Sequence, residues 1–247
     1  TDDKTTGEVT DTVNYFPAVP AGGYVGPDGQ LIEYRNPESQ SKEPTWLLGV
    51  GYRPVTDILT YAKYARGYRQ GSVNIGGTTG FDTHDPETVD SYEIGAKTSF
   101  FGKFPGTFNV AAFYNDLQDQ QIQFGYFKSS GTGTTAIVNA GGSTVWGMEA
   151  DGSVYLTESV LLSASYTYLD TEVDEVIFPT ELQLISPQPV STTTASGEPL
   201  PYSPKNKYAV TASYLLPVDP TWGDMRASVT YAWIDEMQAV AEAASIY

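Results

Sequence analysis

The stretch PETVDSYEIGAKTSFFGKFPGTFNVAAFYND, residues 86–116, carries the pattern that decides the fold. It contains the run of alternating side chains 89–101 and all but the last residue of a second run, 107–117, joined by a short turn rich in glycine. In the middle of both runs one parity is uncharged and mostly aromatic or aliphatic, and in the first run the other parity carries Glu93 and Lys97. A period of two predicts β-strands whose two faces meet different environments. We therefore predict an antiparallel hairpin with one apolar face and one polar face.

The composition of the 247 residues favours an all-β protein and excludes several classes. Tyrosine accounts for 18 residues and suits boundaries where one end of a side chain is apolar and the other is wet. The formal net charge of −17 argues against nucleic-acid binding, because such proteins are basic. Without cysteine there is no disulfide framework and no thiolate metal site.

The opening residues do not resemble a signal peptide, and no segment is expected to be a helical membrane span. The opening TDDKTTGEVT lacks a basic region followed by an apolar one. No apolar run approaches the roughly 18–20 residues that a spanning helix needs. A membrane protein with this sequence would therefore be a β-barrel, the other structure that satisfies its backbone within lipid.

Eight segments are rich in tyrosine, valine, phenylalanine and threonine and are predicted to be strands. Several reach the roughly 9–11 residues that a tilted strand needs to cross a bilayer. The segments are 45–52, 58–68, 89–101, 107–117, 137–155, 160–169, 205–216 and 226–234. We expect 1–44 to be an extracellular loop segment, 45–234 to form the barrel strands and loops, and 235–247 to begin a further extracellular loop.

The connections between these strands alternate between short and long. This asymmetry is typical of outer-membrane barrels, which have short periplasmic turns and long extracellular loops. A soluble sandwich could show it by chance, although long structureless loops are uncommon in compact domains. The short connections are 53–57, 102–106, 156–159 and 217–225, and the long ones are about 69–88, 118–136 and 170–203.

The two parities of the strands predict two faces. One parity is uncharged, with aromatic residues mostly at strand ends and small or aliphatic residues between them, as in a lipid-facing band between two aromatic girdles. The opposite, polar parity fits a wet or plugged lumen. In a soluble sandwich the aromatic parity would form the core, so periodicity alone leaves both interpretations open. The girdle residues are Trp46, Tyr52, Tyr64, Tyr92, Phe100, Phe108, Tyr114, Tyr166, Tyr168, Tyr208, Tyr214, Tyr231 and Trp233.

The strand 58–68 carries a cation on each parity, so its orientation has to be chosen. If Lys63 faced lipid near mid-membrane, the cost would be roughly 2–4 kcal/mol. We therefore assign Lys63 to the lumen. Arg66 then lies near the outer headgroups, where a long side chain can reach lipopolysaccharide phosphate.

The acidic residues fall mostly in the inferred extracellular segments. They could bind divalent cations at the lipopolysaccharide surface or only keep the loops solvated, and both interpretations stay open. The single histidine, His84, lies beside Asp82, Asp85 and Glu87, but this spacing matches neither an EF-hand nor a zinc pattern. We predict an ordinary polar loop there rather than a metal site.

Consecutive segments resemble the barrel of TonB-dependent outer-membrane receptors. The resemblance covers about residues 45–234. It is carried by PETVDSYEIGAKTSFF (86–101), FNVAAFYND (108–116) and VNAGGSTVWGMEAD (138–151), flanked by YAKYARGYRQGSVN (61–74), LTESVLLSASYTYLDTE (156–172) and PKNKYAVTASYLLP (204–217).

The resemblance implies an all-β fold, an antiparallel transmembrane β-barrel. This chain would supply about eight strands of a larger (about 22-stranded) barrel with an N-terminal plug inside. It also implies an outer-membrane receptor of a Gram-negative bacterium that imports a scarce ligand, commonly a ferric siderophore, with energy from the TonB complex. The sequence shows no recognisable plug and no TonB box, and its end reads as loop. We interpret the chain as part of the C-terminal half of the barrel; a complete eight-stranded barrel is the alternative.

The expected partners follow from the same resemblance. They are outer-membrane lipid and lipopolysaccharide, the receptor's own plug domain outside this chain, the TonB complex through the missing N-terminal part, and a small-molecule ligand; we expect no nucleic acid. Two other functions remain open at this stage. One is a passive porin or small structural barrel, and the other is a soluble extracellular β-sandwich that acts as a binding module.

Candidate site residues fall into two groups, and neither is catalytic. No histidine–carboxylate–nucleophile set is supported, so we predict no enzyme, no cofactor and no metal site. Glu149 and Asp151 could form an acid–base pair, but contact with a plug is the favoured interpretation. The lumen- or plug-facing residues are Lys63, Glu93, Lys97, Glu149 and Asp151, and the ligand-binding candidates at the top of one strand are Arg69, Gln70 and Asn74. Contact with ligand and simple ordering of the loop are equally open for the second group.

Overall fold

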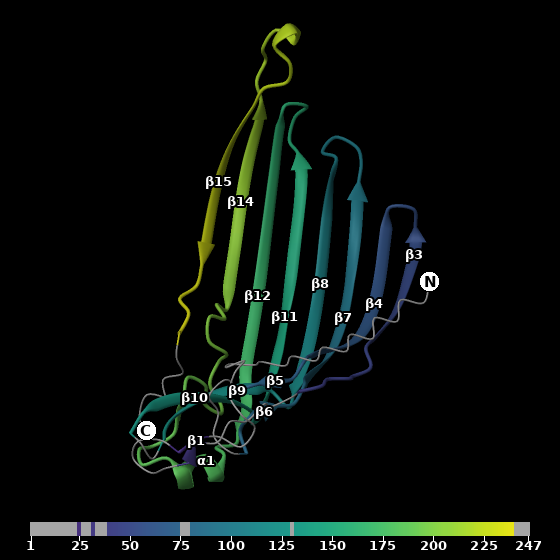
Figure 1. Cartoon of the computed structure of the whole chain (residues 1–247). Helices are drawn as coiled ribbons and strands as arrows, with labels where there is room; N and C mark the ends of the chain where they lie inside the picture. Colours follow the sequence, from purple (N-terminus) through teal and green to yellow (C-terminus); the bar gives the residue numbers. More distant parts are fainter. Residues whose placement is uncertain (1–23, 26–30, 33–38, 75–79, 129–130, 240–247) are drawn as a thin grey trace.

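The computed structural model describes residues 24–25, 31–32, 39–74, 80–128 and 131–239, and its main element is one antiparallel sheet of eight long strands (Figure 1). Each long strand pairs with the next long strand along the chain, in the order β15-β14-β12-β11-β8-β7-β4-β3. The strands are β3 (Trp46–Val55), β4 (Ile58–Arg69), β7 (Glu87–Phe100), β8 (Gly106–Gln118), β11 (Gly141–Tyr155), β12 (Val160–Val176), β14 (Asn206–Leu215) and β15 (Arg226–Ile234).

All eight predicted strands form, with corrections to some of their ends. The predicted strand 137–155 is wrong as a single element, because the chain leaves the ladder at Ala140 and divides into β10 (Gly133–Asn139) and β11. The turn between β3 and β4 is shorter than predicted, since β3 continues to Val55. β12 continues to Val176 and does not end at 169.

The sheet is open among the described residues, with β3 and β15 at its two edges. The alternative of a closed eight-stranded barrel is therefore not what the chain forms. All short turns lie at one end of the sheet and all long loops at the other, as the alternation of connection lengths predicted (Figure 1). Of the described helices, none is long and apolar enough to cross a membrane.

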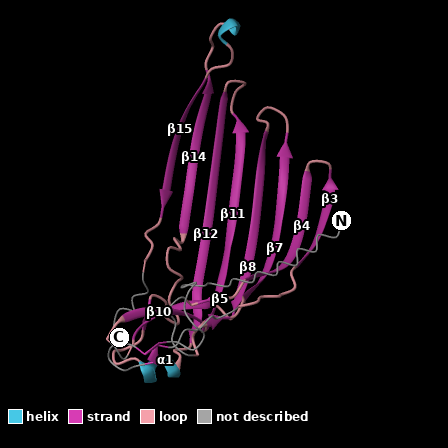
Figure 2. Cartoon of the chain, in the orientation of Figure 1, coloured by secondary structure: helices cyan, strands magenta, loops and turns pink. Residues whose placement is uncertain are grey.

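The long loops contain structure that the sequence analysis missed. Figure 2 shows that helix is confined to short pieces at the two ends of a structure made mostly of strands. At the loop end, β9, β10 and β13 form a second sheet beside α1. The short elements are β1 (Tyr24–Val25), β2 (Leu31–Ile32), β5 (Ser72–Val73), β6 (Thr83–His84), β9 (Gln121–Phe127), α1 (Thr180–Ile185), β13 (Ser191–Thr192) and the 3₁₀ turn η1 (Pro220–Trp222).

The hydrophobic core of the described structure lies in these loops, which we call the loop cap (residues 119–128, 131–140 and 177–198). No described part of the chain forms a second layer against the main sheet, so its apolar side chains are exposed. The cap residues must instead bury their own apolar surface against one another. The core consists of Ile122, Phe124, Tyr126, Ala136, Ala140, Leu182 and Val190.

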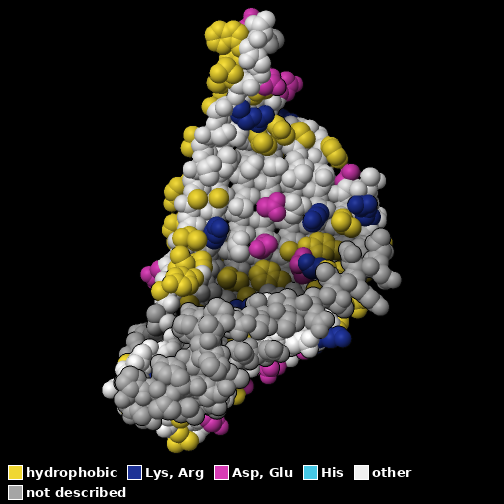
Figure 3. All heavy atoms as spheres, viewed as in Figure 1, with side chains coloured by type: hydrophobic (Ala, Val, Ile, Leu, Met, Phe, Trp, Pro, Cys, Tyr) yellow, Lys and Arg dark blue, Asp and Glu magenta, His cyan; other side chains and the backbone are white. Residues whose placement is uncertain are grey.

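The two faces of the main sheet differ as the alternation predicted. On the apolar parity Ile94 is 63% exposed and Val229 is 75% exposed, which a water-soluble sheet would not tolerate over so wide a surface. Figure 3 shows the other face, with isolated acidic and basic side chains among uncharged atoms. The exposed apolar face is therefore suited to lipid.

Aromatic rings line the loop end of the apolar face in a row that crosses several strands. Tyr64 stacks on Tyr92 with ring centroids 5.0 Å apart. Further along the row, Trp146 lies 5.5 Å from Tyr168. Such amphipathic rings are enriched where a membrane meets water, so the row is placed as a girdle would be.

Candidate functional site

Charged residues gather on the polar face in the middle of the main sheet. The strand register places Tyr61, Gly95 and Ala111 in one row with Glu149 on β11. An adjacent row pairs Lys63 with Glu93, and the row on the other side contains Lys97, Asn109 and Asp151. The five residues expected to face the lumen thus lie on a single face, in three neighbouring rows.

Glu93 is held in place by interactions with two neighbouring side chains. The Tyr61 hydroxyl donates to Glu93 Oε1 at 2.8 Å, and the Lys63 ammonium forms an ion pair with the same carboxylate. Lys97 Nζ lies 6.0 Å from the centre of the Tyr61 ring. The two donors and the nearby cations fix the position of Glu93, so that it presents a largely neutralised carboxylate.

The acidic side of the cluster is more open. Asn109 Nδ2 donates to Asp151 Oδ2 at 2.9 Å, while the Glu149 side chain is exposed. A shallow pocket of about 220 Å³ lies between these residues and is also lined by Tyr61 and Lys97. Both signs of charge are present within a few strands, so this surface can form ion pairs with a polypeptide of either local charge.

The residues expected to bind ligand take part in contacts between loops. Arg69 Nη2 lies 2.8 Å from Glu87 Oε2, and the Gln70 carbonyl accepts from Gln121 Nε2 at 2.9 Å. Asn74 is 7% exposed, and its amide is bonded to the backbone of Phe81 and to both backbone groups of Ile137. These contacts show that the residues order the loops; contact with ligand stays a prediction.

Asn139 is an organising residue that the sequence analysis missed. Its Oδ1 accepts from the backbone N–H of Asp85 at 2.7 Å, and its Nδ2 donates to the carbonyls of Asp85 and Asp119, both at 2.8 Å. It therefore fastens the loop after β4 to the loop after β8. These partners are remote in sequence, so local patterns carry no signal for them.

His84 is buried at the same junction, 8% exposed, and its Nδ1 has no hydrogen-bond partner among the residues that the structure describes. Burial lowers the pKa of His84 and the Arg69 cation lowers it further, whereas the carboxylates of Asp85 and Glu87 act in the opposite direction. Among the residues that the structure describes, no three histidine or carboxylate side chains come together as metal ligands.

Arg66 lies on the apolar face, as expected, and it forms an ion pair with a neighbouring strand. Its Nη1 lies 3.3 Å from Asp90 Oδ2, and its guanidinium lies 5.6 Å from the centre of the Trp46 ring. The Tyr64 hydroxyl also donates to Asp90, at 2.8 Å. The sequence analysis missed Asp90, the direct neighbour of Arg66 on β7, and contact of Arg66 with lipopolysaccharide stays a prediction.

The arrangement of one sheet with an apolar face, a charged face and long loops at one end matches a known family. The family model "TonB dependent receptor-like, beta-barrel" matches residues 8–245. This chain belongs to that family. TonB-dependent receptors transport ligands and are not enzymes, and those that bind siderophores are outer-membrane proteins of Gram-negative bacteria.

Several members of the TonB-dependent receptor family are similar to this chain. The probable TonB-dependent siderophore receptor PiuA of Acinetobacter baumannii is 27% identical over 136 residues, which is 52% of this chain and 17% of that protein. The crystal structure of PiuA from Acinetobacter baumannii matches with a TM-score of 0.62 at 20% identity, over 83% of this chain and 28% of that one. The ferric yersiniabactin uptake receptor FyuA from Yersinia pestis gives 0.59 at 17% identity, over 80% and 27%.

These likenesses confirm the fold class, an antiparallel sheet of a TonB-dependent receptor barrel. The chain spans less than a third of the length of each of these relatives. The soluble β-sandwich alternative is wrong, because the eight long strands form one sheet and do not divide into two packed layers.

Proposed function

We propose that the intact protein is an outer-membrane receptor that binds a scarce extracellular ligand, a ferric siderophore, and imports it into the periplasm with energy transmitted by TonB. The observation that carries this proposal is the division of one sheet into an apolar face and a charged face. Lipid covers the first, and a plug domain that lies outside this chain covers the second. The names of the similar receptors support the ligand class.

The charged face suggests how a plug would be held and released. Exposed ion pairs contribute about 0–1 kcal/mol each, so several of them can position a folded domain without fixing it permanently. Glu93 and Lys63 are already paired with each other. Lys97 and Glu149 are exposed on either side of the shallow pocket, and we assign them, together with Asp151, the direct contacts with the plug.

The ligand would approach from the loop end. Arg69 and Gln70 lie there, at the end of β4, and remain proposed ligand contacts. Arginine suits an anionic ligand, but Arg69 is already paired with Glu87, so its charge is only partly available. Asn74 is a weaker candidate for ligand contact, because its amide is buried and already forms hydrogen bonds within the protein.

Growth and uptake measurements test the transport function. The gene for the full-length receptor would be deleted and restored, and cells would be grown under iron limitation with radioactive ferric siderophores. Deletion is expected to abolish uptake of the transported complex, and collapse of the proton gradient is expected to stop uptake while leaving binding at the cell surface. Uptake that continues without the gradient would instead indicate a passive pore.

A further inference from the structure

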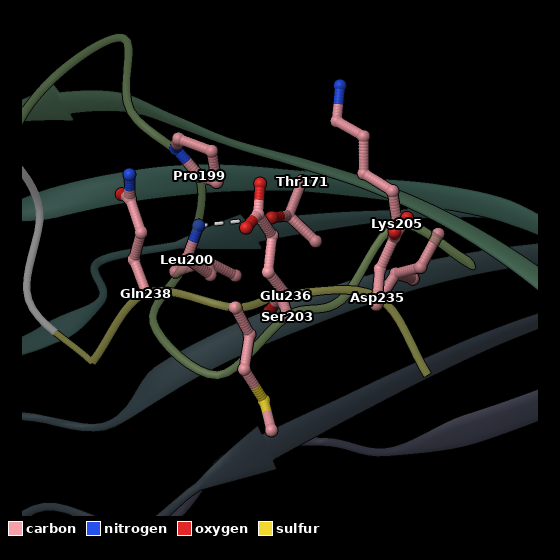
Figure 4. A pocket seen from close by; sticks show the side chains of 10 residues that line it. Thr171, Pro199, Leu200, Ser203, Lys205, Asp235, Glu236 and Gln238 are labelled. Carbon is pink, nitrogen blue, oxygen red and sulfur yellow. Dashed lines mark hydrogen bonds between the residues drawn. The ribbon is translucent and has the colours of Figure 1, made fainter. Parts of the chain in front are cut away.

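A second cavity opens on the polar side of the main sheet, at the loop end of β12, β14 and β15 (Figure 4). Its volume is about 460 Å³. Leu169 and Thr171 of β12 form one wall, on the same parity as Thr167 and Ser165. The cavity therefore opens toward the side of the sheet from which ligand would enter, and away from lipid.

Hydrogen bonds hold the segments that frame this cavity. The Leu200 N–H donates to Thr171 Oγ1 at 3.0 Å, which ties the loop after β13 to β12. Asn206 Nδ2 donates to Asp235 Oδ2 at 2.7 Å, and the Tyr202 N–H donates to the Gln238 carbonyl at 2.8 Å. The walls come from segments distant in sequence but are linked to one another, so the cavity has a defined shape.

The charges that line the cavity are unbalanced. Asp235 and Glu236 contribute two carboxylates, and Lys205 contributes one ammonium group. Lys205 Nζ in turn lies 3.9 Å from a third carboxylate, that of Asp170. Glu236 is exposed and forms no ion pair with any residue in the described part of the chain.

Figure 4 shows the side chains of Gln238, Glu236 and Lys205 extending to the same side, with Glu236 between the other two. Leu169, Leu200 and Met237 also line the cavity and supply apolar surface. A cation placed at Glu236 would gain a charged acceptor together with this apolar surface for its carbon chain. An anion there would meet an excess of negative charge.

We propose that this cavity binds a primary ammonium group of the transported ligand, so that the receptor selects ligands carrying a free amine. The inference rests on the proposed function and adds to it the charge of the ligand. Glu236 accepts from the ammonium group, and the nearby apolar side chains contact the carbons that carry it. A ligand recognised only through an anionic group at Arg69, with no contact in this cavity, would give the opposite selectivity.

Three small probes that differ in one terminal group test this selectivity without knowledge of the natural ligand. Aminobutanol, butanediol and hydroxybutanoate would each be titrated against the full-length receptor in lipid nanodiscs, with empty nanodiscs as the blank, by saturation-transfer NMR. We expect aminobutanol to bind about two- to five-fold more tightly than the other two, the range of an exposed ion pair. Added salt should reduce that preference.

Two matched variants locate the effect. Glu236→Gln keeps the shape of the side chain and removes its charge, and it should abolish the preference for aminobutanol. Glu181→Gln removes an exposed carboxylate on α1, outside the cavity, and should keep the preference. Equal binding of all three probes, tighter binding of hydroxybutanoate, or an undiminished preference in Glu236→Gln would overturn the proposal.

Uptake of iron separates this inference from the proposed function. If the wild-type receptor restores growth under iron limitation but shows no preference for the amine, transport stands and the ammonium site is wrong. If the preference is present and depends on Glu236 but no siderophore is imported, the cavity is confirmed and the proposed transport function is wrong.

Discussion

Tyr61 lies directly over Gly95, so close that a β-carbon at position 95 would be 2.6 Å from the tyrosine hydroxyl oxygen. The same hydroxyl donates to Glu93. Gly95 thus provides the space in which a tyrosine from the neighbouring strand crosses the polar face and positions a carboxylate.

Replacing Gly95 with alanine should displace the Tyr61 ring and break the hydrogen bond to Glu93. We expect a loss of about 1–2 kcal/mol in the free energy of unfolding, measured by urea titration of the receptor folded into lipid vesicles. Tyr61→Phe removes only the hydroxyl and should cost less. If Gly95→Ala matched the wild type while Tyr61→Phe was destabilised, the close approach would not matter for stability.

Reversing charges on the polar face tests contact with the plug. In the intact receptor, Lys97→Glu combined with Glu149→Lys should reduce uptake and increase movement of a fluorescent label on the plug. Glu158→Lys reverses a carboxylate in the turn after β11 and serves as the control. If plug retention and uptake were unchanged in the double variant, the proposed docking role would be wrong.

A charge on the apolar face should be far more damaging than one on the polar face. Ile94→Arg places a cation where lipid is expected and should cost roughly 2–4 kcal/mol near mid-membrane. Ala111→Arg adds the same side chain one strand away on the polar face and should cost much less. Folding yield in vesicles, followed by the gel shift of the folded form, reports the difference; equal yields would argue against a lipid-covered face.

The loop junction at His84 should loosen in mild acid. Because the pKa of His84 in the folded protein lies below its ordinary value, folding favours the neutral ring. That contribution is complete above about pH 6.5 and is lost as the pH falls from there toward the folded pKa. We expect faster hydrogen exchange at the backbone amides of Asp85 and Ile137 in mild acid, after correction for intrinsic rates.

His84→Gln supplies the control for this titration, since glutamine does not ionise in the range. In the His84→Gln variant, the hydrogen-exchange rates of the same backbone amides should be independent of pH after correction for intrinsic rates. If wild type and His84→Gln responded to acid alike, another group would be responsible.

The strands could be predicted from the sequence because the two faces of each strand differ in polarity. Alternation marks Ile94 and Lys97 as members of opposite faces without knowledge of any partner strand. The end of β12 was missed because acidic residues follow Leu169, although Thr171 and Val173 are buried on the alternate positions. Alternation predicts a strand most clearly when one parity is apolar. Beyond Leu169, acidic residues occupy the parity that is apolar earlier in the strand, so the pattern is lost.

The loop cap was missed for a different reason. Ile122, Phe124 and Tyr126 do alternate, which is the signal of a half-buried strand, but the residues that cover them come from elsewhere. Leu182 and Val190 join this core across a wide gap in sequence. Likewise, the polar parity predicted Lys63 and Glu93, but their ion pair depends on strand register, which alternation does not determine.

The hydrophobic core in the loop cap means that the cap and the main sheet are stabilised in different ways. The cap gains stability when its apolar side chains leave water, whereas the apolar side chains of the main sheet are exposed on the face that we propose contacts lipid. Only the first process carries the large heat-capacity change that accompanies transfer of apolar surface out of water. Calorimetry of the receptor in vesicles should therefore resolve a separate melting step for the cap, and its temperature should not change with the lipid composition of the vesicles.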